Sequence, residues 1–299
     1  MNTLFLPLPR RAALLCASVL GATLCLSGCA TAPTTHLART AAALHFPLRV
    51  VTLEAPMAVD AGRLQEVFAP GAKQPLADDD PRLVQARQRG EARAAAAMAA
   101  ALGGEPNVVV IVPAEEQSPL DALRSRALAS AITPDEAMRL HAATGADVLL
   151  RYGITDYGLT PAAWRHGYIA FEVVTTVALA AVIAYSGSRA AQAAATLYLA
   201  QETAEESAEA YATFQAFDEV CRPVRMEAQL LALQPPALLW QAGDTGISDI
   251  KLGRYFRKVG ADERDRQINQ ATGDAVRGIA RDLHAALEYS RLRAALHAD

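Results

Sequence analysis

The first 29 residues contain a segment that we expect to be cleaved off, and they mark the point at which the folding part of the chain begins. Residues 12–26 are largely apolar, and Arg10 and Arg11 stand directly before them. A membrane-spanning helix needs about 20 apolar residues, whereas a shorter apolar core behind basic residues is typical of a secretory signal peptide. We therefore predict that residues 1–28 form a signal peptide. The remaining 271 residues are enough for one sizeable core, or for a domain with a large insertion.

The apolar segment ends in the tetrapeptide Leu26, Ser27, Gly28 and Cys29. This tetrapeptide resembles the lipobox of bacterial lipoproteins, in which the cysteine is acylated and becomes the first mature residue. The resemblance implies that Cys29 carries fatty acids such as palmitate and binds membrane lipid, with roughly 0.8 kcal/mol gained per buried methylene. It also implies a lipid-anchored position at the periplasmic face of the outer membrane. The reason is Ala30, which stands where an aspartate tends to retain a lipoprotein in the inner membrane.

The charge balance bears on nucleic-acid binding. The whole chain has a formal net charge of −4, and loss of residues 1–28, which contain two arginines and no acid, changes it to −6. Lys and Arg are mixed with Asp and Glu along the sequence, whereas a nucleic-acid-binding protein requires a basic face. We therefore expect no nucleic-acid partner.

Cysteine usage excludes an intrachain disulfide in the predicted mature protein. Cys16 and Cys25 lie in the signal peptide and Cys29 is the expected acylation site, which leaves Cys221 without a second cysteine. A buried apolar cysteine, a reactive thiol and an intermolecular crosslink are the alternatives for Cys221. We favour the buried cysteine.

Alternating sequence patterns after the signal peptide predict an α+β fold. Residues 29–45 are interpreted as the acylated N-terminus and a flexible tether, and residues 46–299 as one periplasmic domain. In chain order the domain is expected to contain a strand at 48–53, a helix at 81–102, a strand at 107–112, a helix at 134–144, a strand at 148–157, an antiparallel hairpin within 224–242 and a closing helix around 276–287. This order predicts a small mixed sheet packed by helices.

Two helix starts carry clear capping signals. Asp80 followed by Pro81 is typical of an N-cap with proline at the first helical position. Thr133, Pro134 and Glu136 form a capping box with the same proline placement. Both signals indicate where a helix begins.

Three further patterns predict the environment of the strands. The continuous apolar run at 107–112 favours a central strand covered on both faces. Residues 234–236 contain two prolines and are expected to reverse the chain within the hairpin. Asp244, Thr245 and Gly246 are expected to form the next turn rather than a catalytic motif.

Parts of the predicted domain resemble a group of bacterial outer-membrane lipoproteins. The resemblance rests on residues 144–150, which run into residues 154–157, and on the later hairpin that ends at residues 238–240. The chain looks like the curli-secretion lipoprotein and the lipoprotein activators of penicillin-binding proteins. This resemblance implies a compact α+β domain behind a lipid anchor.

Residues 164–216 do not fit a minimal domain and are expected to form an insertion. Residues 168–185 contain a single charged residue, Glu172, and residues 190–211 are rich in alanine and then acidic. We expect these two segments to form an apolar helical hairpin joined at residues 186–188. A membrane-inserting segment at 168–185 is one alternative, and β-hairpins that enlarge the sheet or line a channel are another.

The sequence contains no recognisable catalytic, cofactor or metal signature. The six histidines lack metal-ligand spacing, and no cysteine pair accompanies them; they are His36, His45, His141, His166, His284 and His297. Asp78, Asp79 and Asp80 are interpreted as a solvated loop that caps a helix rather than a cation site. We therefore expect no metal, no cofactor and no enzymatic activity.

These observations favour a lipid-anchored, non-enzymatic envelope lipoprotein. It would act as an accessory or scaffold for a periplasmic or outer-membrane assembly, through contacts with other envelope proteins. The alternative is an oligomeric secretion or export component, a homo-oligomer in which residues 168–185 enter the membrane. A third hypothesis is an envelope hydrolase without a recognisable motif, which would require a cleft with several convergent titratable groups.

Overall fold

The computed structural model describes residues 45–69, 72–112, 118–161, 165, 214, 218–249, 251–254, 257 and 259–296. The chain divides into two compact units, one formed by residues 1–30 and 162–217 and the other by residues 31–161 and 218–299. In the first unit only Arg165 and Phe214 are described, with the Arg165 guanidinium carbon 5.8 Å from the centre of the Phe214 ring. The predicted signal peptide and, apart from these two residues, the predicted insertion lie outside the described residues.

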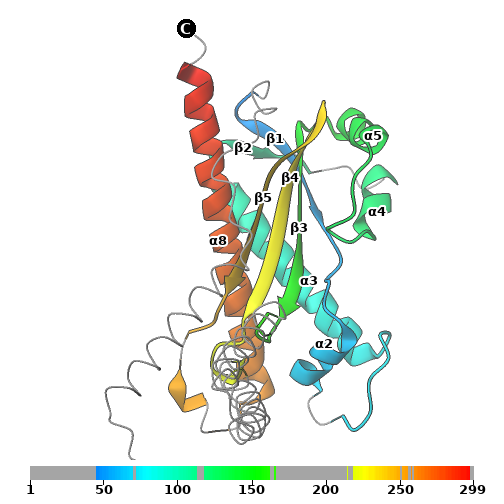
Figure 1. The fold of residues 1–299 in the computed structure, drawn as a ribbon, viewed down its shortest axis with the longest axis vertical. Coiled ribbons are helices and arrows are strands. Elements are labelled where there is room, and N and C mark those ends of the chain that lie inside the picture. The colour runs from blue at the N-terminus through cyan, green and yellow to red at the C-terminus, as the bar shows by residue number, and fades with distance from the viewer. Residues whose placement is uncertain are drawn as a thin grey trace, which may run out of the picture. The chain divides into compact units, whose positions relative to one another are not determined.

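The second unit contains a five-stranded mixed sheet packed against helices, which confirms the predicted α+β class (Figure 1). The strands are β1 (Leu48–Glu54), β2 (Val108–Val110), β3 (Val148–Tyr157), β4 (Val224–Leu233) and β5 (Pro236–Gly246). Their order in the sheet is β2-β1-β3-β4-β5. Strand β1 is parallel to β2 and β3, whereas β3, β4 and β5 are antiparallel neighbours.

Helices cover both faces of this sheet (Figure 1). The helical segments are α2 (Ala61–Phe68), α3 (Pro81–Gly103), α4 (Ser118–Arg124), α5 (Pro134–Thr144), the short 3-10 helix η2 (Leu252–Arg254) and α8 (Ala261–Leu296). On one face α3 and α8 form the larger core, in which Val50, Leu150 and Trp240 are almost fully buried. On the other face α4 and α5 cover a smaller core around Val51 and Leu149.

The capping signals place two helix starts as predicted. The Asp80 side chain accepts a hydrogen bond from the backbone N–H of Arg82 at the start of α3. The Thr133 hydroxyl accepts from the N–H of Glu136, and the Glu136 carboxylate accepts from the N–H of Thr133, so the capping box is complete. Helix α5 ends at Thr144, and Gly145 follows as its C-cap with a φ of 64°, which glycine readily adopts.

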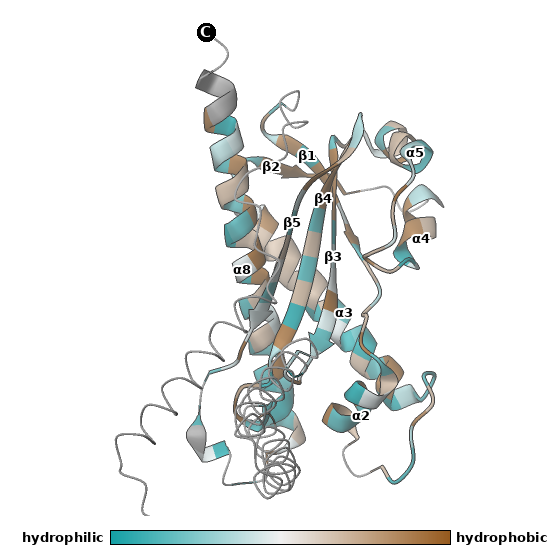
Figure 2. Cartoon of the chain, in the orientation of Figure 1, coloured by the Kyte–Doolittle hydropathy of each residue, from teal (hydrophilic) through white to brown (hydrophobic). Residues whose placement is uncertain are grey.

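The prediction of a central strand at 107–112 is wrong. Strand β2 lies at the edge of the sheet and pairs with β1 on one side, and Val109 and Val110 are 46% and 37% exposed. Figure 2 shows that β2 is hydrophobic despite this edge position. A continuous apolar run does not reveal how many strands pair with it, which explains the error.

The predicted turn at Asp244, Thr245 and Gly246 is also wrong, because β5 continues through Gly246. Gly246 pairs with Val224 of β4 and lies against the backbone of α8 at Ala271 and Ala275. Because glycine has no side chain, β5 can pack closely against α8 at this position. Turn-forming residue types do not distinguish this use from a chain reversal.

Several helices go beyond the sequence prediction. Helices α2 and α4 and the 3-10 helix η2 are not among the predicted elements, and α8 begins well before residue 276. The first half of α8 is polar in composition, but Ile268, Ala271 and Ala275 are fully buried and continue its packing face. Alanines contribute little to a hydrophobic periodicity, so the sequence pattern conceals this half of the helix.

Strand β3 is buried on both faces, including Arg151, whose side chain is 1% exposed. The guanidinium Nη1 donates to the carbonyls of Leu128 (3.2 Å) and Ser130 (2.8 Å), and Nη2 donates to those of Arg126 (3.3 Å) and Ala127 (3.0 Å). Arg151 thus satisfies four carbonyls in the loop after α4. This loop is held on the sheet by a charged residue from the central strand.

Candidate functional site

The predicted lipidation site lies outside the described residues. This applies to Leu26, Ser27, Gly28 and Cys29 alike, so their prediction stays a prediction. Within the described part of the chain, no helix is both long enough and apolar enough to cross a membrane. Residues 168–185 fall outside that part.

The other sequence candidates are dispersed over the domain. Nδ1 of His141 donates to the carbonyl of Ala146 (2.7 Å), and Nδ1 of His284 lies 2.7 Å from the Glu105 carboxylate. Cys221 is 2% exposed, and burial raises the pKa of its thiol. Both properties disfavour a reactive thiol and support the interpretation of Cys221 as a buried cysteine.

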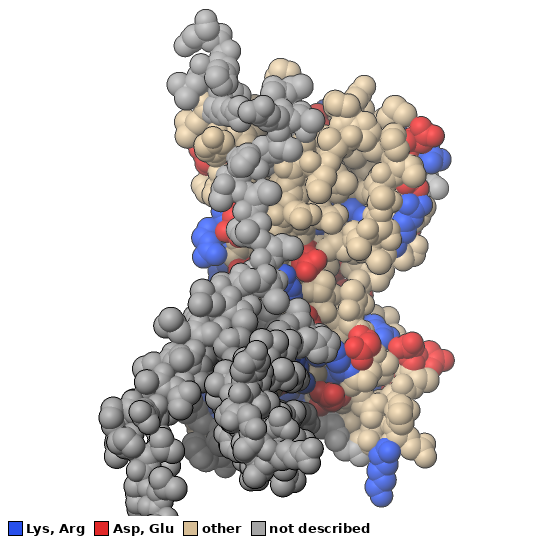
Figure 3. All heavy atoms as spheres, viewed as in Figure 1, with Lys and Arg blue, Asp and Glu red and all other residues tan. Residues whose placement is uncertain are grey.

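Charged side chains of both signs lie next to one another on the face shown in Figure 3. Arg63 pairs with Asp156 (2.9 Å) and Arg126 pairs with Glu136 (2.5 Å). The hydrogen bond from Arg126 lowers the pKa of Glu136 to about 2. In each pair the two opposite charges neutralise each other. These pairs therefore leave little net charge that could attract a ligand.

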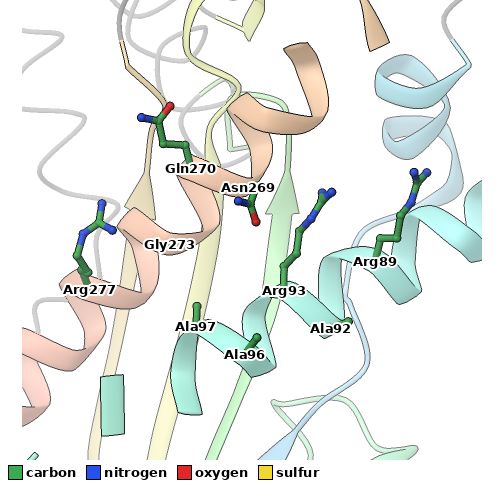
Figure 4. Close-up of a pocket in the computed structure, with 9 residues that line it drawn as sticks. All are labelled: Arg89, Ala92, Arg93, Ala96, Ala97, Asn269, Gln270, Gly273 and Arg277. Carbon is green, nitrogen blue, oxygen red and sulfur yellow. The ribbon is translucent and has the colours of Figure 1, made fainter. Parts of the chain in front are cut away.

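A first candidate site is a groove of about 600 Å³ between α3 and α8 (Figure 4). Its floor consists of small residues, and its rims carry polar side chains; the lining residues are Arg89, Ala92, Arg93, Ala96, Ala97, Asn269, Gln270, Gly273 and Arg277. The small residues let the two helices approach without filling the space between them. Figure 4 shows the three arginines around this groove, two on α3 and one on α8.

Two of these arginines already have acidic partners. Arg93 pairs with Asp265 of α8 and donates to the Tyr157 hydroxyl (3.3 Å), which joins α3, α8 and β3. Arg277 pairs with a neighbouring acid on its own helix. Arg89 is exposed and donates through Nε to the carbonyl of Gln85 (3.3 Å). The groove can therefore accept an anionic group mainly at Arg89.

A second candidate site is a pocket of about 430 Å³ at the carboxyl end of β1. It is lined by Thr52, Leu53, Glu54, Ala55, Pro56, Glu91, Ala95, Arg124 and Tyr152. Glu54 ends β1 and stands in register with Tyr152 of β3, while α3 contributes Glu91. The carboxyl ends of parallel strands commonly form ligand sites because side chains from several elements converge there.

The Glu54 carboxyl group is strongly perturbed. Its Oε1 is buried and has no hydrogen-bond partner in the described part of the chain. Burial, followed by the nearby charge of Glu91, raises the pKa of Glu54 to about 8. Glu91 itself accepts a hydrogen bond from the N–H of Met57 (2.9 Å) through Oε1. A carboxyl group that is protonated near neutral pH is a mark of a functional site as well as of burial.

The raised pKa of Glu54 predicts how stability depends on pH. The unfolded carboxyl group titrates near 4.5 and the folded one near 8. The folded state therefore binds more protons between these values, and the free energy of unfolding falls as pH rises through that window. Because solvent reaches part of the side chain, we expect a discounted loss of about 1–2 kcal/mol.

Urea denaturation at about pH 5 and about pH 8.5 measures this effect. The Glu54→Gln variant should lose most of the difference, because an amide does not titrate in this range. Glu66→Gln makes the same chemical change at an exposed position of α2 and should retain the wild-type difference. An unaltered pH dependence in Glu54→Gln would contradict the raised pKa.

Sequence reasoning missed this pocket. Glu54, Glu91 and Tyr152 are far apart in the chain and follow no spacing motif; the parallel pairing of β1 with β3 and the packing of α3 bring them together. The pocket contains convergent titratable groups, as a hydrolase would need, but no serine, cysteine or histidine among its lining residues.

Comparison with known proteins adds little to this description. No family model and no curated protein matches the chain. A hypothetical protein from Chlamydia trachomatis, whose structure was solved at 1.65 Å resolution, aligns with 80% of this chain and 98% of its own length. The sequence identity is 9% and the TM-score is 0.38.

Proposed function

We propose that this chain is a lipid-anchored, non-enzymatic envelope lipoprotein that acts as an accessory or scaffold at the periplasmic face of the outer membrane. The tetrapeptide Leu26–Cys29 behind a basic and apolar segment is the observation that carries the proposal. The resemblance to the curli-secretion and penicillin-binding-protein activator lipoproteins supports it. Contacts with other envelope proteins would then be its means of action.

The physical basis of the anchor is the acylation of Cys29. One acyl chain gives marginal and reversible membrane binding, whereas two or more hold a protein stably at the surface. Bacterial lipoproteins carry more than one chain on this cysteine. A folded domain that is tethered in this way meets its partners at a surface, where its effective concentration is high.

The variant Cys29→Ala tests the anchor. We expect it to lose incorporation of labelled palmitate and to move from the membrane fraction to the soluble fraction, with at least about a tenfold change in distribution. The control is Cys25→Ala, which makes the same change four residues earlier and should remain membrane-bound. Membrane retention of Cys29→Ala in a form that lacks residues 1–28 would contradict anchoring by acylation alone.

The second candidate function is an oligomeric secretion or export component. The observation that favours it is the run at residues 168–185, in which Glu172 is the single charged residue. Persistent membrane retention of Cys29→Ala in a form that lacks residues 1–28 would implicate this run. The mass of the purified protein in detergent then decides, because a discrete ring of many subunits supports a pore and a monomer excludes it.

A further inference from the structure

We propose that the pocket formed by Glu54, Glu91 and Tyr152 binds a primary alkylammonium group. Such a group is the end of a lysine side chain on a partner protein, or a free alkylamine. This inference does not depend on the lipid anchor, so it stands or fails separately from the proposed function.

The pocket provides acceptors where an ammonium group needs them. An ammonium group has three N–H donors and no acceptor. Oε1 of Glu54 is buried without a donor, and Glu91 uses one oxygen for the N–H of Met57, which leaves its other oxygen for a ligand. Tyr152 and Thr52, which carry hydroxyl groups, also line the pocket. A donor that enters here would satisfy an oxygen whose burial is otherwise costly.

The remaining walls suit an alkyl chain. Leu53, Ala55, Pro56 and Ala95 contribute apolar surface to the lining. Lysine places four methylenes behind its charged end, and such chains commonly lie along apolar surface while the charge reaches polar groups. A cavity of about 430 Å³ has ample room for a chain of this size.

Once Glu54 is ionised, the lining contains two carboxylates and one cationic residue, a balance that favours a monovalent cation. Arg124 of α4 is the one cationic residue in the lining; its side chain is 67% exposed and pairs with Asp121 at 3.5 Å. The other charged or titratable groups of the lining are two carboxyl groups, Glu54 from β1 and Glu91 from α3, and the Tyr152 phenol from β3. Within the described part of the chain, no three His, Cys, Asp or Glu residues are grouped to hold a metal ion. A divalent cation would therefore find too few ligands here.

A protonated Glu54 links this binding to pH. A bound cation favours the ionised carboxylate, so binding near neutral pH should release a proton. The affinity for an alkylammonium ion should accordingly rise between about pH 6 and about pH 8.5, while the ligand stays charged.

The test uses n-butylammonium, which matches the lysine side chain, and n-butanol as its neutral counterpart. Thermal unfolding of the full chain in detergent should shift upward with n-butylammonium at millimolar concentration, as expected for so small a ligand, and should not shift with n-butanol. Glu54→Gln and Glu91→Gln should each weaken binding by about tenfold or more, whereas Glu66→Gln should leave it unchanged.

Several outcomes would overturn the proposal. An equal shift with n-butanol would show an apolar cavity only, and a shift with calcium ions in place of the amine would show a metal site. Binding that appears only in Arg124→Gln would show that Arg124 itself occupies the pocket. If a glutamate variant does not fold, the rise of wild-type affinity with pH still decides, because a flat profile contradicts a role for Glu54.

A further arm of the same experiment separates the two ligand sources. A short peptide with a central lysine is compared with the same peptide acetylated at that lysine. Tighter binding of the lysine peptide than of n-butylammonium indicates a partner protein, whereas tighter binding of n-butylammonium indicates a free amine. Either result supports the ammonium chemistry, and binding of the acetylated peptide with equal affinity opposes it.

Discussion

Replacing Arg151 with methionine is expected to lower the free energy of unfolding by about 3–5 kcal/mol. The side chain is 1% exposed and donates hydrogen bonds to four carbonyls of residues 126–130. Methionine fills much of the same volume but offers no donor, so these carbonyls lose their partner in a region that water does not reach freely. Guanidinium chloride denaturation measures the loss.

Two controls make the Arg151 result specific. Arg266→Met makes the same change at an exposed position of α8 and should alter the free energy of unfolding by no more than about 0.5 kcal/mol. Arg151→Lys keeps the charge, but its single ammonium group cannot serve four carbonyls, so we expect an intermediate loss. A loss below about 1 kcal/mol in Arg151→Met would show that the loop after α4 does not depend on this residue.

The substitution Gly246→Ala is expected to cost about 3 kcal/mol or more, or to prevent folding. A Cβ at this position would overlap the carbonyl oxygen of Ala271 and the backbone nitrogen of Ala275 on α8. Both atoms belong to the backbone of a long helix, so they cannot rotate away as a side chain could. Helix α8 would have to separate from β5, and the larger core would lose part of its packing.

Gly273→Ala is the matched control for Gly246→Ala. Gly273 lies on α8, and a Cβ there would meet the Arg277 guanidinium at 3.6 Å, which is an ordinary contact. Because alanine favours a helix over glycine, this variant should raise the free energy of unfolding by about 0.5–1 kcal/mol. The melting temperatures of the two variants should therefore move in opposite directions. A downward shift of equal size in both would contradict the argument from close packing.

The parts of the fold that the sequence predicts depend on local interactions. Asp80 and Thr133 cap their helices with hydrogen bonds to residues two or three positions along the chain. The hairpin of β4 and β5 turns at Gln234 and Pro235, and the prolines in this stretch of the sequence predict the turn. The residues that form each of these signals lie within a few positions of each other. The local structure they favour therefore does not depend on how distant parts of the chain pack.

The parts that the sequence does not predict depend on contacts between distant residues. The edge position of β2 depends on which strands pair with it, and the burial of Arg151 depends on a loop that lies about 20 residues earlier. The pocket around Glu54 is a stronger case, since α3, α4 and β3 contribute its other charged or titratable groups. No periodicity in the sequence predicts such contacts between distant residues.

The central claim is the acylation of Cys29, and mass spectrometry of the protein purified from membranes tests it most directly. We predict a mature chain whose first residue is Cys29, with fatty acids attached to that residue and residues 1–28 absent. An uncleaved chain that carries an unmodified thiol at Cys29 would contradict the account.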